Sequence, residues 1–239
     1  MAAPVTPIAR SRSYNLRVEP SPRFRDLTVG AFVDRLASAE PVPGGGSAAA
    51  VAGSLAAALV AMVAALSEGR PKYAEHMALH AEAAGSARAL ADQFLFLADE
   101  DAEAYAGFGA AMRLPRESDL EREARGAAIR QAARSASDVP YRTVEACLEV
   151  VALAEALAGR SNRNASSDLE VAALLAVAAS RAAAANVYVN LPSIEDEAAS
   201  RELLAATDRL VSDIDKLASQ ARETVRSRAA RPPLEAGRG

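Results

Sequence analysis

An acidic run set between apolar residues is the clearest candidate for proton transfer. Asp101 lies four residues after Leu97 and four before Tyr105, so a helix would turn its carboxyl group toward the packed side. By the same geometry Glu100 and Glu103 would face solvent. A carboxyl group among apolar side chains either finds a partner or binds its proton more tightly, and both suit acid–base catalysis. The alternative interpretation is a solvated acidic run on a helix surface.

A glycine-rich turn is the candidate for holding a polar group of a substrate. Gly44, Gly45 and Gly46 precede Ser47, which we expect to cap the next helix. Backbone N–H groups at a helix start bind anions and oxyanions, so these amides are predicted to orient a substrate. A phosphate loop would need a lysine directly after the glycines, but Ser47 and Ala48 follow them here. Glycines that only let two helices pack closely are the other interpretation.

Amide side chains stand at both ends of a second apolar segment. Asn162 and Asn164 precede it together with Asp168, and Asn186 and Asn190 follow it. Amides donate and accept hydrogen bonds, so such a cluster is suited to reading the edge of a heterocycle. The same residues also suit the simpler role of capping helix ends.

Other reactive residue types give weaker signals. Arg70 and Lys72, with arginines at the far end of the following helix, either bind a carboxylate tail or are ordinary solvated helix ends. His76 and His80 share a helix face but lack a third ligand, so we predict no metal site. Cys147 has no histidine near it in sequence and cannot form an internal disulfide. It therefore indicates no thiol nucleophile and favours a reducing, cytoplasmic compartment.

The composition predicts an all-helical protein. Of 239 residues, 51% are hydrophobic but only 4% aromatic, so the core must be built largely from Ala, Leu and Val. The net charge of −4 gives no basic excess for binding nucleic acid. Residues 41–67 carry no charge, but Ala, Gly and Ser dominate them. We therefore expect a fully buried central helix there and no membrane span.

Hydrophobic periodicity and turn residues divide the chain into helices. We expect them over 26–39, 47–68, 72–112, 116–137, 141–158, 168–185 and 194–227. Thr28 and Ser193 are expected to start the first and last of these, and Ser167 with Glu170 forms a capping-box pattern. Pro140 is expected to break or kink the chain between the fourth and fifth helices.

Short turns between long helices predict a single domain. We expect an up-and-down bundle with an Ala-rich core over 25–229, a flexible extension over 1–24 and a disordered tail over 230–239. The apolar stripe of the last helix is typical of an outer helix or a dimer surface.

Several segments, taken in order and with their separations, resemble the cyclodeaminase/cyclohydrolase family. They are residues 43–50, 69–73, 99–105, 113–115, 139–140, 162, 167–173 and 186–191. The resemblance spans about 27–225. Ser161 departs from the family, which often has glycine before the loop asparagine, and Pro71 interrupts a normally basic run.

The resemblance implies a helical bundle, usually a homodimer, that acts on a tetrahydrofolate without a resident cofactor, metal or nucleotide. It implies one of two reactions. In the first, a cyclohydrolase opens the methenyl bridge with water to give 10-formyltetrahydrofolate. In the second, a cyclodeaminase closes the formimino group and releases ammonia. No fused transferase domain is encoded in these residues, which favours the cyclohydrolase. A non-catalytic helical scaffold is the alternative from another class.

With this resemblance, each candidate residue receives an expected role. We expect Asp101 to be the acid–base group, Asp168 a second carboxylate or pterin anchor, and the amides of 44–47 to orient the polar end of the substrate. The remaining predicted substrate contacts are Arg70, Lys72, Asn162, Asn186 and Asn190.

Overall fold

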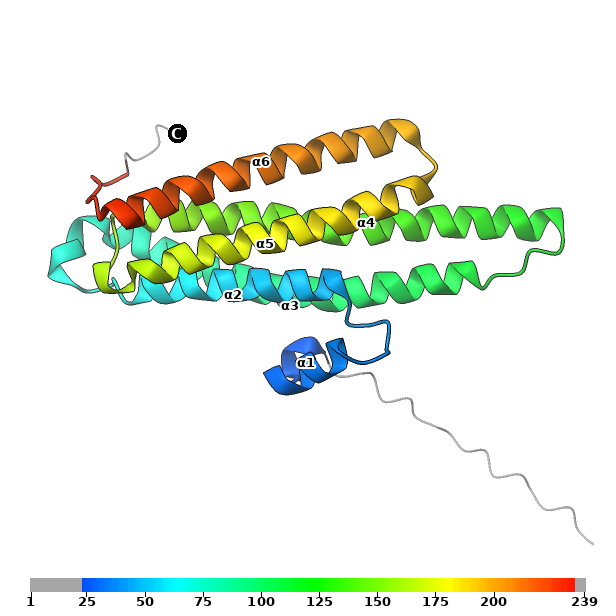
Figure 1. The fold of residues 1–239 in the computed structure, drawn as a ribbon, viewed down its shortest axis with the longest axis horizontal. Helices are drawn as coiled ribbons and strands as arrows, with labels where there is room; N and C mark the ends of the chain where they lie inside the picture. Colours follow the sequence, from blue (N-terminus) through cyan, green and yellow to red (C-terminus); the bar gives the residue numbers. More distant parts are fainter. Residues whose placement is uncertain (1–22, 235–239) are drawn as a thin grey trace, which may run out of the picture.

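Long helices packed side by side form the fold seen in the computed structural model, which describes residues 23–234 (Figure 1). Its α-helices are α1 (Val29–Leu36), α2 (Gly45–Ala65), α3 (Met77–Met112), α4 (Asp119–Leu157), α5 (Ser166–Asn190) and α6 (Glu197–Ser227). Short 3-10 helices are η1 (Phe24–Asp26), η2 (Pro71–His76), η3 (Arg163–Ala165) and η4 (Leu191–Ile194). No strand occurs among the described residues, so the all-α prediction is confirmed for them. The extension expected over 1–24 lies outside the described residues, except for its last two positions.

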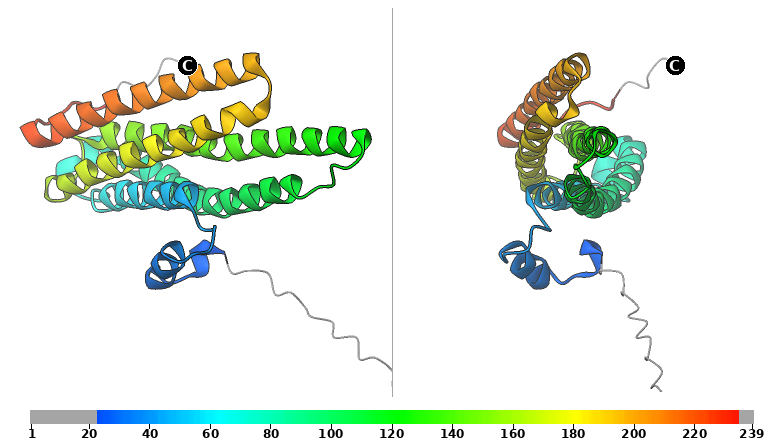
Figure 2. Two further views of the ribbon diagram at one scale, coloured as in Figure 1. Left: turned by 45° about the vertical axis from the view of Figure 1, so that its right-hand side comes forward. Right: turned by 90° about the vertical axis from the view of Figure 1, so that its right-hand side faces the viewer.

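The main helices run up and down. α2 packs against α3 and α5, α4 packs against both of these helices, and α6 covers α4 and α5 (Figure 2). α3 and α4 extend beyond the ends of α2 and α5 as a two-helix hairpin (Figure 1). The start of α2 therefore lies at the base of this hairpin, beside the middle part of α3.

Small residues allow α2 and α3 to approach closely. A Cβ atom added at Gly53 would lie 2.5 Å from the ring of Phe94, which is fully buried. Many other core positions of these two helices are alanines, such as Ala57 and Ala87. Because a buried side chain cannot be enlarged here without displacing a neighbour, the distance between α2 and α3 is set by these residues.

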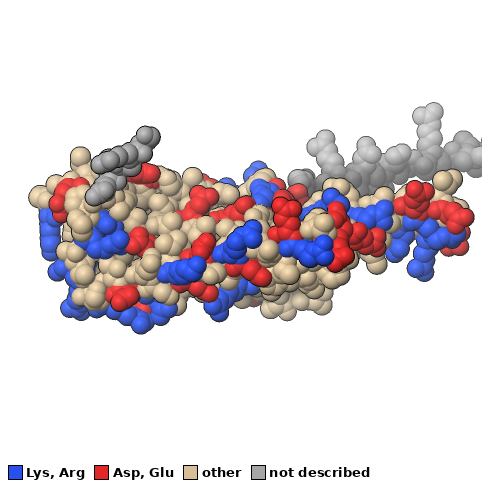
Figure 3. All heavy atoms as spheres, turned by 90° about the horizontal axis from the view of Figure 1, so that it is seen from above, with Lys and Arg blue, Asp and Glu red and all other residues tan. Residues whose placement is uncertain are grey.

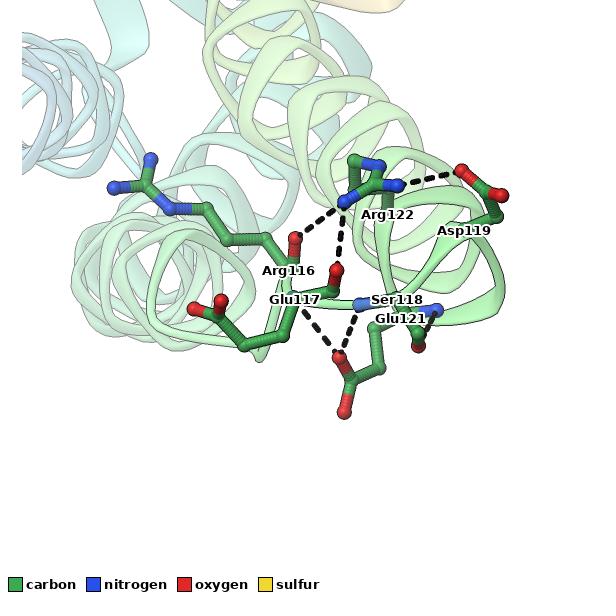
Figure 4. Close-up of polar contacts among 6 residues, drawn as sticks. All are labelled: Arg116, Glu117, Ser118, Asp119, Glu121 and Arg122. Atoms are coloured by element: carbon green, nitrogen blue, oxygen red, sulfur yellow. Dashed lines mark hydrogen bonds and ion pairs between the residues drawn. The ribbon is translucent and has the colours of Figure 1, made fainter.

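The start of α4 is fixed by a capping box that lies two residues later than the expected start. Ser118 caps the helix by accepting from the Glu121 N–H, and the Glu121 carboxylate accepts from the N–H of Ser118 at 2.8 Å (Figure 4). The side chain of Arg122 donates to the carbonyl groups of Arg116 and Glu117. These contacts close the turn at the tip of the hairpin.

The prediction of a capping box at the start of the next helix, α5, is wrong. α5 begins at Ser166 with no side-chain cap at its start. The carboxylate of Glu170 instead forms ion pairs with Arg222 and Arg226 of α6. A partner distant in sequence therefore outcompetes the local hydrogen bond.

Of the two effects expected of Pro140, a break or a kink, the break does not occur, because α4 continues through the proline from Asp119 to Leu157. A proline inside a helix leaves the carbonyl group four residues earlier without its N–H donor. That carbonyl belongs to Ala136, and the side-chain amide of Asn190 donates to it at 2.8 Å. The hydrogen bond from α5 replaces the one that the proline removes.

Three expected helix starts or ends also differ in detail. Thr28 caps α1 as predicted, but α2 begins at Gly45, so Ser47 lies inside the first turn and is not the cap. Asp196, and not Ser193, caps α6. α5 continues to Asn190, five residues beyond the expected end.

The expectation that α2 is fully buried is wrong. Leu55 and Met62 of α2 are exposed, as are Val171 and Leu174 of α5. By length and composition alone, two helical segments, Gly45–Ala65 and Arg163–Ile194, are apolar enough to cross a bilayer, although 56% and 44%, respectively, of their most apolar 18-residue stretches are buried inside the bundle. The two helices thus present apolar surface on the outside of the molecule.

Part of the segment expected to form a disordered tail contacts the bundle. The guanidinium group of Arg231 forms an ion pair with Glu155 at 2.6 Å, and its backbone N–H donates to the Gly159 carbonyl group. The Pro232 carbonyl group accepts from Arg160. These contacts hold residues 231 and 232 against the loop after α4.

Candidate active site

The carboxyl group of Asp101 on α3 lies against the first turn of α2. Its Oδ2 atom is 2.9 Å from the hydroxyl oxygen of Ser47, and the same hydroxyl oxygen is 3.0 Å from the carbonyl oxygen of Ala98. Ser47 is fully buried, whereas Asp101 is half-buried. The glycine-rich turn and the acidic run, 54 residues apart in sequence, therefore meet, as the prediction required.

Gly46 provides the space for this carboxyl group. A Cβ atom at position 46 would lie 2.1 Å from the Oδ1 atom of Asp101, so any larger residue would displace the carboxyl group. Gly44, the N-cap residue of α2, supplies no side-chain cap. Asp101 therefore reaches the start of α2 from another helix and occupies the region that a capping side chain normally fills.

Burial and hydrogen bonding have opposite effects on Asp101. Burial is the larger effect and raises the pKa of its carboxyl group above the ordinary value, whereas hydrogen bonds that the side chain and backbone of Ser47 donate to the ionised form lower it. The positive end of the α2 dipole also favours the ionised form. The net direction is upward, which brings the carboxyl group closer to the proton affinity that an acid catalyst needs near neutral pH.

Asn186 is the second predicted residue that the fold brings to this turn. A Cβ atom at Gly45 would lie 3.8 Å from the Nδ2 atom of Asn186. Nδ2 donates to the Ala182 carbonyl group at 2.9 Å, which leaves the amide oxygen and one N–H free for a ligand. Asn190, one turn further along α5, is engaged with Ala136 of α4.

The acidic run has other partners that the sequence did not reveal. Glu100 was expected to face solvent, but its side chain is only 26% exposed and pairs with Arg142 of α4 at 2.9 Å. Asp99 accepts from the backbone N–H of Phe24 at 2.8 Å. A cavity of about 620 Å³ lies along this side of α3, lined by both carboxylates and by Phe96. No local pattern marks Arg142, because it lies 42 residues from Glu100.

Asp168 and Asn162 lie at the other end of the bundle. Asp168 precedes Asn186 by 18 residues of α5, about 27 Å along the helix axis. The backbone N–H of Asn162 donates to the hydroxyl group of Ser67, just beyond α2, and its side chain accepts from the Asn164 N–H. Asn162 thus makes the capping contacts that were the alternative interpretation. One protomer does not bring these two residues to Asp101, and their substrate contacts stay predictions.

Arg70 and Lys72 also lie far from Asp101. They belong to the turn between α2 and α3, where Arg70 is exposed and the Lys72 ammonium group lies 5.6 Å from the centre of the Tyr73 ring. α3 is about 54 Å long, which separates them from Arg113 at its other end. Their contact with a carboxylate tail therefore stays a prediction.

The two histidines form a buried pair near the same far end. Their ring centres are 6.2 Å apart, and His80 Nε2 lies 2.9 Å from the Arg160 carbonyl oxygen. Over residues 23–234, no three His, Cys, Asp or Glu side chains are grouped as metal ligands. The absence of a metal stays a prediction. Burial raises the pKa of the Cys147 thiol to about 12, which makes it a poor nucleophile.

Comparisons with known proteins agree on one family. A family model described as formiminotransferase-cyclodeaminase matches residues 28–209. A methenyltetrahydrofolate cyclohydrolase from Methylorubrum extorquens is 39% identical over 201 residues, which cover 84% of this chain and 97% of that protein. A formimidoyltransferase-cyclodeaminase from Gallus gallus is 32% identical over 185 residues, which cover 77% of this chain but 34% of that protein.

A solved structure matches the fold over most of its length. It is the crystal structure of formiminotetrahydrofolate cyclodeaminase from Thermotoga maritima, with a TM-score of 0.78. The match covers 85% of this chain and 98% of that chain at 24% sequence identity. At this level of identity the likeness shows the shared helical bundle.

Proposed function

Because this chain belongs to the formiminotransferase-cyclodeaminase family, we propose that it is a methenyltetrahydrofolate cyclohydrolase and that Asp101 moves the protons. The observation that supports the catalytic role most directly is the position of the Asp101 carboxyl group, 2.9 Å from the Ser47 hydroxyl group and against Gly46 at the start of α2. A carboxyl group placed there has a raised proton affinity and lies against the backbone N–H groups at the start of a helix.

The cyclohydrolase is favoured over the cyclodeaminase by the extent of the similarity. The 39% identity to the bacterial cyclohydrolase extends over nearly its whole length, whereas the chain spans about a third of the bifunctional vertebrate relatives. The two reactions are closely related, so the cyclodeaminase is the second candidate.

The proposed reaction needs protons at two atoms. Water adds its oxygen to the methenyl carbon and releases one proton to the solvent, which gives a tetrahedral carbon between N5 and N10. The bond from this carbon to N5 then breaks as N5 takes a proton from Asp101. The hydroxyl group on the same carbon returns its proton to the Asp101 carboxylate and becomes the formyl oxygen. Asp101 therefore ends each turnover as it began.

The same carboxyl group would serve a cyclodeaminase. N10 would attack the formimino carbon, and the departing nitrogen would leave as ammonia after taking the N10 proton and one proton from Asp101. Neither reaction requires an electron carrier. We therefore keep the proposal that no resident cofactor or metal takes part, and that the substrate is a reduced folate.

We also propose that the protein is a homodimer, formed through the outer faces of α2 and α5. No charged residue occurs between Gly45 and Ala65, and Leu55 of α2 and Leu174 of α5 are about half exposed. By contrast, the face seen from the α6 side carries many Lys, Arg, Asp and Glu side chains (Figure 3). Exposed apolar surface of this kind is stabilised when a second copy covers it.

This dimer would give the distant predicted residues a place near the site. A two-fold axis that crosses α5 near residue 177, midway between 168 and 186, would set Asp168 of one protomer level with the partner's Asn186. Asp168 and Asn162 would then approach the site from the partner subunit. We keep their predicted substrate roles on that basis, and a cytoplasmic location stays part of the proposal.

The activity can be measured directly. Purified full-length protein is mixed with methenyltetrahydrofolate, and loss of the ultraviolet absorbance of the methenyl bridge is followed against buffer. Accelerated loss supports the cyclohydrolase, and ammonia released from the formimino substrate instead would support the cyclodeaminase. Neither activity would favour the non-catalytic scaffold.

A further inference from the structure

The contacts of the Ser47 hydroxyl group restrict where the protons lie in the candidate site. Its oxygen lies within hydrogen-bonding distance of two acceptor atoms, the Asp101 carboxyl oxygen at 2.9 Å and the Ala98 carbonyl oxygen at 3.0 Å. A hydroxyl group carries one hydrogen, so it can donate a full-strength hydrogen bond to only one of them. If Asp101 were ionised, one of these two short oxygen–oxygen contacts would lack a proton.

Both contacts are satisfied when Asp101 carries a proton. Asp101 then donates from Oδ2 to the Ser47 oxygen, and Ser47 donates to the Ala98 carbonyl group. We propose that Ser47 is a positioning residue that holds the proton on Asp101 in the resting enzyme and keeps it ready for transfer to the leaving nitrogen. This inference rests on the proposed function, and it adds the starting protonation state and the residue that maintains it.

A second serine of α2 makes the same kind of contact with a carbonyl group of α3. Ser54, two turns further along α2, donates to the Ala91 carbonyl group of α3 at 2.9 Å. In both pairs an α2 serine bonds an α3 carbonyl group, and the seven-residue steps are equal on the two antiparallel helices. Ser47 therefore repeats a helix-to-helix hydrogen bond, and donating to Ala98 is its expected orientation.

The charged side chains near Asp101 have partners of their own, whereas the Ser47 backbone N–H and the positive end of the α2 dipole favour the ionised form against burial. On its own helix, Glu100 is engaged with Arg142 of α4, and Asp99 holds the Phe24 N–H. α2 carries no charged residue. The last two turns of α5 contribute only one titratable group, Tyr188, which donates to Asp208 of α6.

The Ser47 hydroxyl group can also be oriented toward Asp101, and this arrangement has the opposite effect on the pKa of Asp101. If Ser47 donated its hydroxyl hydrogen to an ionised Asp101, it would stabilise the charged form. Removal of the hydroxyl group would then raise the pKa of Asp101. In the proposed arrangement the oxygen of Ser47 accepts from the acid, so its removal lowers the pKa. The sign of the change decides between the two.

The test is a nuclear magnetic resonance titration of full-length protein labelled with carbon-13 at the aspartate carboxyl groups. The Asp101 signal is assigned by its loss in Asp101→Asn. We expect its midpoint to lie above the ordinary value of 3.8 in the wild type, high enough that Asp101 still carries its proton at the pH of the activity assay, and an ionised Asp101 at that pH would overturn the proposal. In Ser47→Ala the midpoint should fall by about half a unit or more, roughly a three-fold loss of proton affinity. Ser54→Ala, which loses the matching helix-to-helix bond, should leave the midpoint unchanged.

Activity provides a second readout that simple structural damage would not reproduce. In Ser47→Ala the decrease of kcat at high pH should begin at a lower pH than in the wild type. The shift should match the shift of the Asp101 titration midpoint, while KM changes little. Cysteine is close to serine in size but is a weak acceptor, so Ser47→Cys should shift the titration midpoint and the pH dependence of kcat in the same direction. This variant replaces Ser47→Ala if the alanine variant does not fold. A midpoint that rises or stays constant in the variant that folds would overturn the role of Ser47.

The two proposals fail in distinguishable ways. Turnover that survives in Asp101→Asn would remove Asp101 from the proposed mechanism, whatever the titration shows. Loss of turnover in Asp101→Asn, together with a midpoint that rises in Ser47→Ala, would keep Asp101 and reject only the resting proton on it.

Discussion

The side chain of Asn190 donates a 2.8 Å hydrogen bond to the carbonyl group of Ala136, the acceptor that Pro140 leaves without its backbone donor. The contact joins α5 to α4 at the level of the candidate site. It explains why a helix of 39 residues continues through a proline. It also assigns Asn190 a structural role, in addition to the substrate role expected from its place in the sequence.

Replacement of Asn190 should therefore destabilise the fold in a way that depends on Pro140. Asn190→Ala should lower the free energy of unfolding by about 1 kcal/mol, because the Ala136 carbonyl group loses its partner. In a Pro140→Ala background the N–H of residue 140 bonds to Ala136, so the same replacement should cost less. Urea unfolding of the four proteins measures this coupling, and equal losses in both backgrounds would contradict the explanation.

Gly46→Ala should affect activity much more than stability. The new Cβ atom would lie 2.1 Å from Asp101 Oδ1, and the flexible aspartate side chain can rotate away at small cost. The carboxyl group would then leave Ser47, so turnover should fall at least ten-fold, equivalent to about 1.4 kcal/mol in the barrier. Steady-state kinetics and thermal unfolding of the same sample check both parts.

Two other glycines provide matched controls for this variant. Gly53→Ala should destabilise the protein by about 1–3 kcal/mol, because its Cβ atom would meet the buried Phe94 ring, with no direct effect on Asp101. Gly85→Ala has open space around it and should stabilise α3 by about 1 kcal/mol. If Gly46→Ala retained full turnover, contact with Gly46 would not be what positions the carboxyl group.

A charge on the exposed face of α2 and α5 should separate the proposed dimer. Leu55→Glu or Leu174→Glu would place a carboxylate in the interface, where an unpaired charge is costly. Leu120→Glu, at the more exposed tip of the α3–α4 hairpin, should not change the assembly. Sedimentation or light scattering measures the mass. A monomeric wild type, or one that binds lipid vesicles through this face, would reject the dimer.

His76 should make the stability depend on pH. Burial is the main cause that lowers the pKa of its imidazole below 6.5, so the folded protein resists a proton that the unfolded chain accepts. The contribution to stability is therefore complete above pH 6.5 and is lost as the pH falls below 6.5 toward the folded-state pKa. Melting temperatures between pH 7.5 and about pH 5.5 should fall less in His76→Leu than in the wild type. Parallel curves for the two proteins would contradict this assignment.

Local patterns predicted those parts of the site that depend on one helix or one turn. The four-residue spacing from Leu97 to Asp101 placed the carboxyl group on the packed side, and Gly46 marked a close approach. Spacing and packing carry this information because helix geometry fixes which side chains share a face. Together, the position of Asp101 and the close approach at Gly46 bring the carboxyl group into contact with Ser47.

Parts that depend on distant partners were not predictable in this way. The continuity of α4 through Pro140 needs an amide from residue 190, and Glu100 is half-buried because Arg142 lies on the neighbouring helix. The separation of Asp168 from Asp101 follows from α5 running antiparallel to α2 over its full length. The spacing of residues within one segment does not predict the direction in which the next helix packs.

The most direct test of the catalytic proposal is turnover of methenyltetrahydrofolate by Asp101→Asn. Asparagine keeps the size of the side chain and an oxygen that accepts hydrogen bonds, so helicity and folate binding should be preserved. It carries no transferable proton, and kcat should fall by a factor of about 100 or more. Turnover equal to that of the wild type, in a variant that folds and binds folate, would contradict the assignment of Asp101 as the acid.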